Sequence, residues 1–257
     1  MLIDTHAHLQ FEDFDNDLPQ VLKRAKDEGV EKIILPGSSL DFSKKGLSLA
    51  SKNDRLYGAV GIHPHHLDEF DSNLKEKLTK LTKRRQPIAI GETGFDFYQV
   101  EENKLKKTAQ KQERLFRLQI ELALKFKLPL IVHCRQAAEE TFTVLNDYKK
   151  EGLRGVFHCY AGGKKRVNLV LELGFYFGLD GNLTYDQGLQ NVVKEIPLEK
   201  ILLETDSPEL TPLPYRQLRN EPKNVKLVAK SLAEIKGLSP TKIAETTSKN
   251  AQKLFAF

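Results

Sequence analysis

The sequence predicts one α/β domain over residues 1–257, a single (β/α)8 TIM-type barrel with a C-terminal closing helix. Eight short apolar segments alternate with helical segments, and about 250 residues is the usual length of this fold. Histidine or carboxylate residues follow the first, fourth, fifth, sixth and eighth apolar segments. Only a closed ring brings the first and last strands side by side, so we prefer the barrel to a doubly wound open sheet.

The first half of the chain contains four of the expected strands and three helices. In the first helix, apolar side chains recur at helical spacing from Leu18 to Ala25, and Gly29 ends the helix. The strands are expected at residues 2–8, 33–35, 56–62 and 87–92. The helices are expected at residues 17–29, 46–52 and 73–85.

The second half repeats this alternation. A long amphipathic helix is expected at residues 107–127, and further helices separate the remaining strands. These strands are expected at residues 130–133, 155–158, 175–178 and 201–204. Ser239 followed by Pro240 combines a helix N-cap with proline at the first helical position, which predicts the closing helix.

The composition is that of a globular protein with a well-solvated surface, since 40% of the residues are hydrophobic and 29% are charged. The first strand begins within two residues of Met1, and no apolar run approaches the ~20 residues of a membrane span. We therefore expect a cytoplasmic protein with no membrane partner. The net charge of +5 suits a polyanionic partner, but a modest basic excess is also common on ordinary surfaces.

Candidate metal ligands gather at the ends of the predicted strands. His6 and His8 are two residues apart, so in an extended strand both side chains point to the same face and can hold one ion. Such a pair is weak evidence alone. It gains weight because later strands end in the same kind of residue, at Glu92, His133, His158 and Asp206.

Seven segments of the sequence carry a family resemblance over nearly the whole chain. They are Ile3–His8, Gly61–Pro64, Gly91–Asp96, Val132–Arg135, His158–Gly162, Leu203–Pro208 and Arg219–Pro222. With these segments in this order, the chain resembles the TatD-type metal-dependent deoxyribonucleases, a branch of the amidohydrolase-like barrel hydrolases. It departs from the family pattern at Gln136, Glu209 and Gln217, where relatives usually carry an aspartate, an aromatic residue and a glycine. These departures affect the expected substrate preference and remove no metal ligand.

The resemblance implies two divalent metal ions, with zinc, magnesium or manganese left open as their identity. His6, His8 and Asp206 would hold one ion, His133 and His158 the second, and Glu92 would bridge both. Two such cations lower the pKa of a shared water toward ~7 and clamp the attacking and leaving oxygens of a displacement.

Three further roles are expected around the metal ligands. Asp206 is expected to receive the proton of the attacking water as well as to bind metal. Glu204 has the same strand parity as Asp206, and we expect it to hydrogen-bond a ligand rather than to bind metal directly. His63 is expected to contact a phosphate or the leaving group, with a packed loop histidine as the alternative.

The rim of the predicted barrel carries candidate substrate contacts. Glycines 162 and 163 precede Lys164, Lys165 and Arg166 at a helix start, and backbone amides there can bind an anion together with basic side chains. A solvated charge run is the alternative. Arg135 is expected to contact phosphate, while Tyr160, Phe97 and Tyr98 are candidates for stacking on nucleobases.

The predicted function is hydrolysis of phosphodiesters in DNA, as a 3'-5' exonuclease that acts on single strands. The alternative is an ester hydrolase of the same superfamily, such as a D-aminoacyl-tRNA deacylase, because the same activated water attacks either centre. A binding protein that keeps metal only for stability is less consistent with these ligands, since structural zinc sites are more often closed by cysteines. Only two cysteines occur in the chain.

Overall fold

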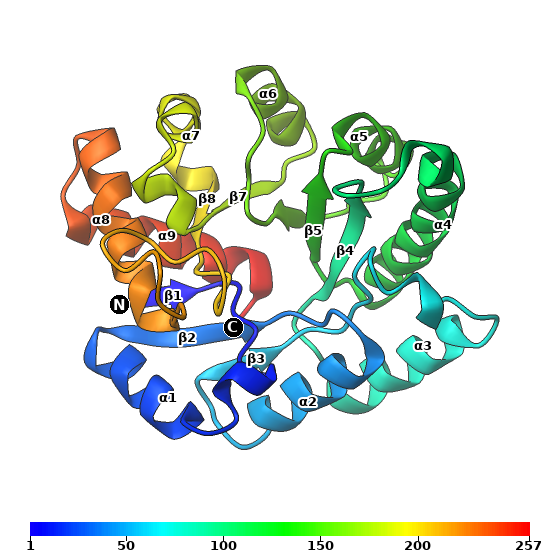
Figure 1. The fold of residues 1–257 in the computed structure, drawn as a ribbon, viewed down its shortest axis with the longest axis horizontal. Helices are drawn as coiled ribbons and strands as arrows, with labels where there is room; N and C mark the ends of the chain where they lie inside the picture. Colours follow the sequence, from blue (N-terminus) through cyan, green and yellow to red (C-terminus); the bar gives the residue numbers. More distant parts are fainter.

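Eight parallel strands form the centre of the molecule, as the computed structural model of residues 1–257 shows (Figure 1). Strands β1 to β3 pair in order, as do β4 to β8. The strands are β1 (Leu2–Asp4), β2 (Val30–Leu35), β3 (Leu56–Gly58), β4 (Ile90–Asp96), β5 (Leu130–Arg135), β6 (Gly155–Phe157), β7 (Tyr176–Leu179) and β8 (Ile201–Leu203).

Backbone contacts at two junctions join these strands into a ring. Beyond β3, Val60 forms a parallel bridge with Ile90, and beyond β1, Ala7 forms one with Ser207. At the second junction the Thr5 amide donates to the Leu203 carbonyl at 3.0 Å. The first and last strands therefore lie side by side, and the expected (β/α)8 barrel is confirmed.

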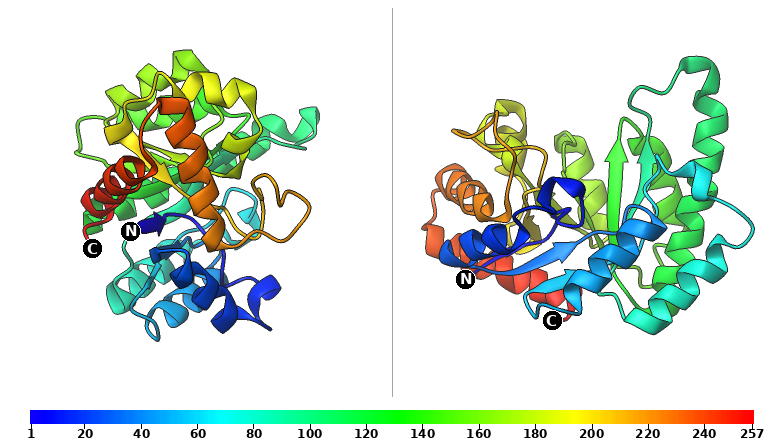
Figure 2. Two further views of the ribbon diagram at one scale, coloured as in Figure 1. Left: turned by 90° about the vertical axis from the view of Figure 1, so that its left-hand side faces the viewer. Right: turned by 60° about the horizontal axis from the view of Figure 1, so that its bottom comes forward.

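Helices surround the ring of strands (Figure 2). Ser39 caps α2 by accepting a hydrogen bond from the Phe42 amide, and Ser239 caps α9 by accepting one from the Lys242 amide. The helices are α1 (Leu18–Asp27), α2 (Leu40–Ala50), α3 (Leu74–Arg85), α4 (Glu102–Phe126), α5 (Ala138–Asp147), α6 (Lys164–Glu172), α7 (Gln187–Val193), α8 (Val225–Lys236) and α9 (Pro240–Phe255).

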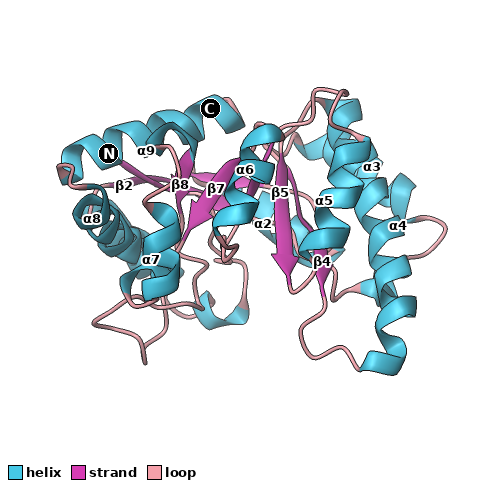
Figure 3. Cartoon of the chain, turned by 90° about the horizontal axis from the view of Figure 1, so that it is seen from above, coloured by secondary structure: helices cyan, strands magenta, loops and turns pink.

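The interior of the barrel is filled by one apolar residue from each strand or its immediate flank, and α9 packs beneath it. The apolar residues inside the barrel form one buried cluster with three residues of α9, namely Ala251, Leu254 and Phe255. Figure 3 shows α9 at the end where the strands begin and long loops at the opposite end. The eight residues are Ile3, Ile34, Ala59, Ala89, Ile131, Val156, Tyr176 and Leu202. The C-terminal helix thus closes the barrel as expected.

Several boundaries differ from the sequence prediction. Strand β4 runs from Ile90 to Asp96 instead of ending at Glu92, because Gly94 adopts a positive φ of 144° that lets the chain continue along β5. Helix α4 begins at Glu102, before the expected residue 107, and α2 begins at Leu40 at its serine cap. No helix combines the length and apolar character needed to span a membrane.

Candidate metal centre

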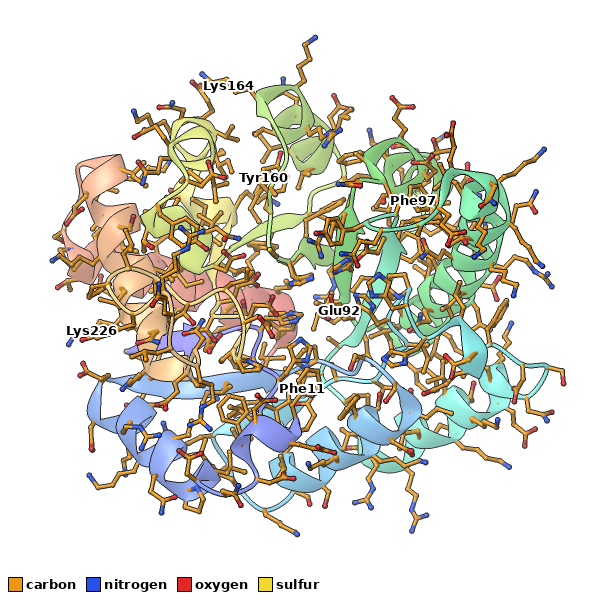
Figure 4. All side chains as sticks on the ribbon, viewed as in Figure 1. Phe11, Glu92, Phe97, Tyr160, Lys164 and Lys226 are labelled. Carbon is orange, nitrogen blue, oxygen red and sulfur yellow. The ribbon has the colours of Figure 1, made fainter.

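The six expected metal ligands meet at the end of the barrel opposite α9. His6 and His8 follow β1, Asp206 follows β8, Glu92 lies within β4, His133 lies within β5 and His158 follows β6. Figure 4 shows Glu92 near the centre of the ring of strands. Three overlapping groups have ligand atoms close enough for one ion, namely His6–His8–Asp206, His6–Glu92–His158 and His63–Glu92–His133.

One group of four atoms has the dimensions of a tetrahedral metal site. The Nε2 atoms of His6 and His8 are 3.2 Å apart. The His6 nitrogen lies 3.4 Å from Glu92 Oε2 and 3.5 Å from Asp206 Oδ1, and the His8 nitrogen lies 3.7 and 3.4 Å from the same oxygens. Ligands at ~2.1 Å from an ion in a tetrahedron are about 3.4 Å from one another. The donor types and their spacing therefore fit a divalent cation.

The second oxygen of Glu92 faces a different set of nitrogens. Its Oε1 atom lies 2.6 Å from His133 Nδ1, 2.8 Å from His158 Nε2 and 3.5 Å from His63 Nε2. His133 Nδ1 and His158 Nε2 are 3.0 Å apart. One carboxylate thus connects two clusters of nitrogen donors, one through each oxygen.

The charges in the cluster are strongly coupled. Burial alone would raise the pKa of Glu92. Electrostatic interaction with His158 and His63, together with the hydrogen bonds from His133 and His158, outweighs this effect, so the pKa lies well below its usual range. Burial and the neighbouring His158 lower the pKa of His6 to about 4. The site therefore presents an ionised carboxylate and a neutral His6 ring, which are the forms that bind cations.

His133 is held by a residue that we did not predict for the site. Its Nε2 atom lies 2.9 Å from Asp96 Oδ2, and the same oxygen lies 3.1 Å from His65 Nε2. Burial opposes protonation of His133, yet hydrogen bonds to Asp96 and Glu92 raise its pKa to about 9. Asp96 has the strand parity of Glu92, so an extended β4 would have indicated this position from the sequence.

Glu204 lies below the metal ligands and is fully buried. It accepts a hydrogen bond from the Cys159 amide, and its Oε1 atom lies 3.7 Å from His158 Nδ1. Burial and the neighbouring Asp180 raise the pKa of Glu204 well above its usual value. It belongs to none of the three groups of candidate ligands, in line with the expected supporting position.

A glycine in β7 provides the space for this carboxylate. A Cβ atom at Gly178 would lie 2.4 Å from Glu204 Oε2 and 2.7 Å from its carboxyl carbon. Any larger residue at this position would therefore displace Glu204.

Asp4 joins the strands that carry His6 and Asp206. Its carboxylate accepts hydrogen bonds from the amide and hydroxyl of Thr205 at 2.9 and 2.6 Å. It also accepts one from the His6 amide at 3.3 Å. Burial raises the pKa of Asp4 to about 7. These contacts fix the spacing between the two strand ends that carry the first ligand cluster.

The rim residues do not all take the expected positions. Arg135 is exposed, and its guanidinium lies 3.6 Å above the ring of the partly exposed Tyr98. Lys164 is exposed, and Figure 4 places it at the periphery of the molecule. Its Nζ atom pairs with Glu195 at 2.8 Å. Lys165 and Arg166 are exposed at the start of α6.

Two aromatic residues expected to stack on bases pack largely into the core, and of the two only Tyr160 also lines a cavity beside the metal centre. Phe97 is 9% exposed, with its ring edge to face with Phe95 at 5.9 Å. Tyr160 is 6% exposed and packs edge to face on Phe177 at 4.9 Å, with its hydroxyl donating to the Gly163 carbonyl. Packing against residues distant in sequence takes both rings away from the surface.

Comparison with known proteins gives matches over the full chain. The family model described as TatD related DNase matches residues 3–256. The uncharacterized metal-dependent hydrolase YabD of Bacillus subtilis is 38% identical, with 99% of each chain covered. The 3'-5' ssDNA/RNA exonuclease TatD of Salmonella typhimurium is 31% identical, with 99% of this chain and 98% of the relative covered.

A solved structure agrees with these matches. YjjV, a TatD homolog from Escherichia coli, superposes with a TM-score of 0.91 at 29% identity, covering 100% of this chain and 98% of its own. The superposition covers the whole of this chain, so it includes every strand of the barrel. The chain therefore belongs to the TatD family of metal-dependent hydrolases.

Proposed function

We propose that the protein hydrolyses phosphodiester bonds in DNA, removing nucleotides one at a time from the 3' end of single strands. The observation that carries this proposal is the position of Glu92, whose two oxygens face separate clusters of nitrogen donors at 2.6 to 3.7 Å. A carboxylate shared in this way suits a pair of cations, and paired cations suit phosphodiester hydrolysis.

In this proposal His6, His8 and Asp206 would hold one ion, His133 and His158 would hold the other, and Glu92 would serve both. Divalent cations bound there would make water more acidic and neutralise charge on the phosphate oxygens. The nitrogen ligands suit zinc or another transition ion, while the carboxylates also admit magnesium or manganese.

The hydrolysis itself forms one bond and breaks another. The oxygen of a water molecule bonds to phosphorus, and the bond from phosphorus to the 3' oxygen breaks. Asp206 accepts a proton of the water, and the departing 3' oxygen takes up a proton to become a hydroxyl. Asp206 is suited to this role because it stays ionised. Burial would raise its pKa, but the hydrogen bond from His8 acts against burial, and the pKa lies below its usual value.

His63 is positioned to contact the phosphate or the departing oxygen. Its Nδ1 atom accepts a hydrogen bond from the His65 amide at 3.1 Å, so the proton of the neutral ring lies on Nε2. Burial lowers the pKa of His63 to about 4, which keeps the ring neutral. The Nε2–H group, 3.5 Å from Glu92 Oε1, is then a donor directed at the cluster.

Glu204 supports the site from below in this proposal. Its carboxylate lies beside His158 and beneath the strand ends, where it can orient the ring of that ligand. The relative from Salmonella typhimurium is named as a 3'-5' exonuclease of single-stranded DNA and RNA, which supports the direction of cleavage and the single-stranded substrate. A site ringed by loops at one end of a barrel also admits a flexible strand end more readily than a rigid duplex.

The test uses metal-free protein titrated with zinc, manganese or magnesium. A 5'-labelled single-stranded oligonucleotide and an aminoacyl ester are followed in parallel over time. We expect a ladder that shortens from the 3' end and depends on added metal. Internal cuts would contradict the exonuclease assignment, and rapid ester hydrolysis without DNA cleavage would favour the deacylase alternative.

A further inference from the structure

A cavity of about 400 Å³ lies beside the metal centre, between the loops that follow β5 and β6. His158 lines it and also contacts Glu92, so the cavity and the cluster of metal ligands share a wall. A volume of this size is in the range of pockets that bind small molecules. The cavity is therefore placed to hold a group attached to whatever reacts at the metal centre.

Two arginines flank the cavity without a carboxylate partner. Arg135 reaches it from the end of β5 and Arg166 from the first turn of α6, and neither forms an ion pair. Arg135 is held in place by its contact with the Tyr98 ring. Lys164, by contrast, is paired with Glu195, so only part of the basic run at the start of α6 faces the cavity.

Arg166 shares the wall of the cavity with Cys134 near the end of β5 and with Tyr160 in the loop after β6. Arg166 therefore places positive charge over the same space.

The rest of the lining is largely apolar. Phe142 and Phe157 are 8% and 3% exposed, and with Tyr160 they form the aromatic part of the wall. Gln136 adds an amide at the rim, which can both donate and accept hydrogen bonds. An apolar wall, one amide and two guanidinium groups match the parts of a nucleotide, which are a flat base with polar edges and a phosphate.

We propose that this cavity binds the terminal nucleotide of the strand, with the base against the aromatic wall and the phosphate between the metal centre and the two arginines. The inference rests on the proposed function and adds to it the residues that select a nucleotide. It assigns substrate binding to Arg166 and Gln136 and leaves the bond-breaking step to the metal cluster.

The first test separates binding from hydrolysis. Steady-state rates are measured for Arg166→Ala and for the isosteric, charge-adding Gln136→Glu on single-stranded DNA and on methyl 4-nitrophenyl phosphate, a diester with no nucleobase. We expect KM for DNA to rise about tenfold in each variant, with little change on the small diester. Arg166→Ala loses a phosphate contact, and Gln136→Glu adds a negative charge that repels the nucleotide. Arg84→Ala is the matched control. It removes an arginine that is also exposed but lies in the last turn of α3 and does not line the cavity.

The second test measures binding directly and does not depend on turnover. Wild-type protein should bind 2'-deoxyadenosine 5'-monophosphate in calorimetry, and both variants should bind it about tenfold more weakly. Equal binding by wild type and variants would overturn the inference, as would equal losses on DNA and on the small diester. If the wild type cleaves no phosphodiester yet binds the mononucleotide through Arg166, the proposed function fails while the cavity assignment stands.

Discussion

The two ring nitrogens of His133 have different partners, with Nε2 2.9 Å from Asp96 Oδ2 and Nδ1 2.6 Å from Glu92 Oε1. Because Asp96 accepts the Nε2–H bond, a metal ion that replaced the proton on Nδ1 would receive the lone pair of that nitrogen at the cluster. A histidine that binds metal commonly uses its other nitrogen in this way, which fixes the tautomer and the ring orientation. Asp96 therefore positions a ligand rather than binding the ion itself.

Replacing Asp96 by asparagine should weaken metal binding by about 10- to 100-fold, because the amide no longer fixes the His133 tautomer. The measurement is competition for metal against a chelator of known affinity. The free energy of unfolding of the metal-free variant serves as the control. An unchanged metal affinity would mean that His133 is oriented without Asp96.

Replacing Glu92 by glutamine should abolish hydrolysis and weaken the binding of both ions. One oxygen of the carboxylate faces each ligand cluster, so the change reduces the negative charge available to both. Metal content per protein chain, measured by elemental analysis after dialysis, should fall together with activity. Wild-type turnover with a full complement of metal would refute the bridging role.

Replacing Gly178 by alanine should destabilise the fold by about 1–3 kcal/mol, the usual cost of overpacking a buried site. The new methyl group would lie 2.4 Å from Glu204 Oε2, and the buried carboxylate has little room to move. The free energy of unfolding is measured by urea denaturation. Gly46→Ala is the control, since its Cβ meets no atom closer than 3.5 Å and alanine favours the helix, so it should be neutral or stabilising.

Replacing Asp17 by asparagine should reduce stability at neutral pH but not in acid. Hydrogen bonds from Arg219 and Arg24 lower the pKa of Asp17 from 3.8 to about 2. Its contribution to stability is therefore present above pH 4 and is lost as the pH falls toward 2. We expect a loss of about 1 kcal/mol at pH 7 after allowance for solvent screening.

The pH dependence is checked by urea denaturation of wild type and variant between pH 7 and pH 2.5. The two unfolding free energies should converge as the pH falls. Asp41→Asn is the control, because its exposed pairing with Lys44 within α2 should contribute little. A difference that stays constant over this range would show that the Asp17 carboxylate is not responsible.

Sequence periodicity predicted the eight strands and the closing helix because each has a local cause, such as the serine cap and proline that begin α9. The extension of β4 to Asp96 was missed, since Gly94 within it reads as a strand end when its positive φ is unknown. No local sequence pattern indicates that the rings of Phe97 and Tyr160 point into the core. It depends on Phe95 and Phe177, which become neighbours only in the barrel.

The packing beneath the metal centre makes the barrel blind-ended. Eight apolar residues fill its interior and α9 seals the end where the strands begin, so nothing can be threaded from one side to the other. Under the proposed activity, the strand end enters and the released nucleotide leaves through the same mouth. Each nucleotide must vacate the site before the shortened strand can advance, so the overall rate is bounded by departure of the product as well as by hydrolysis.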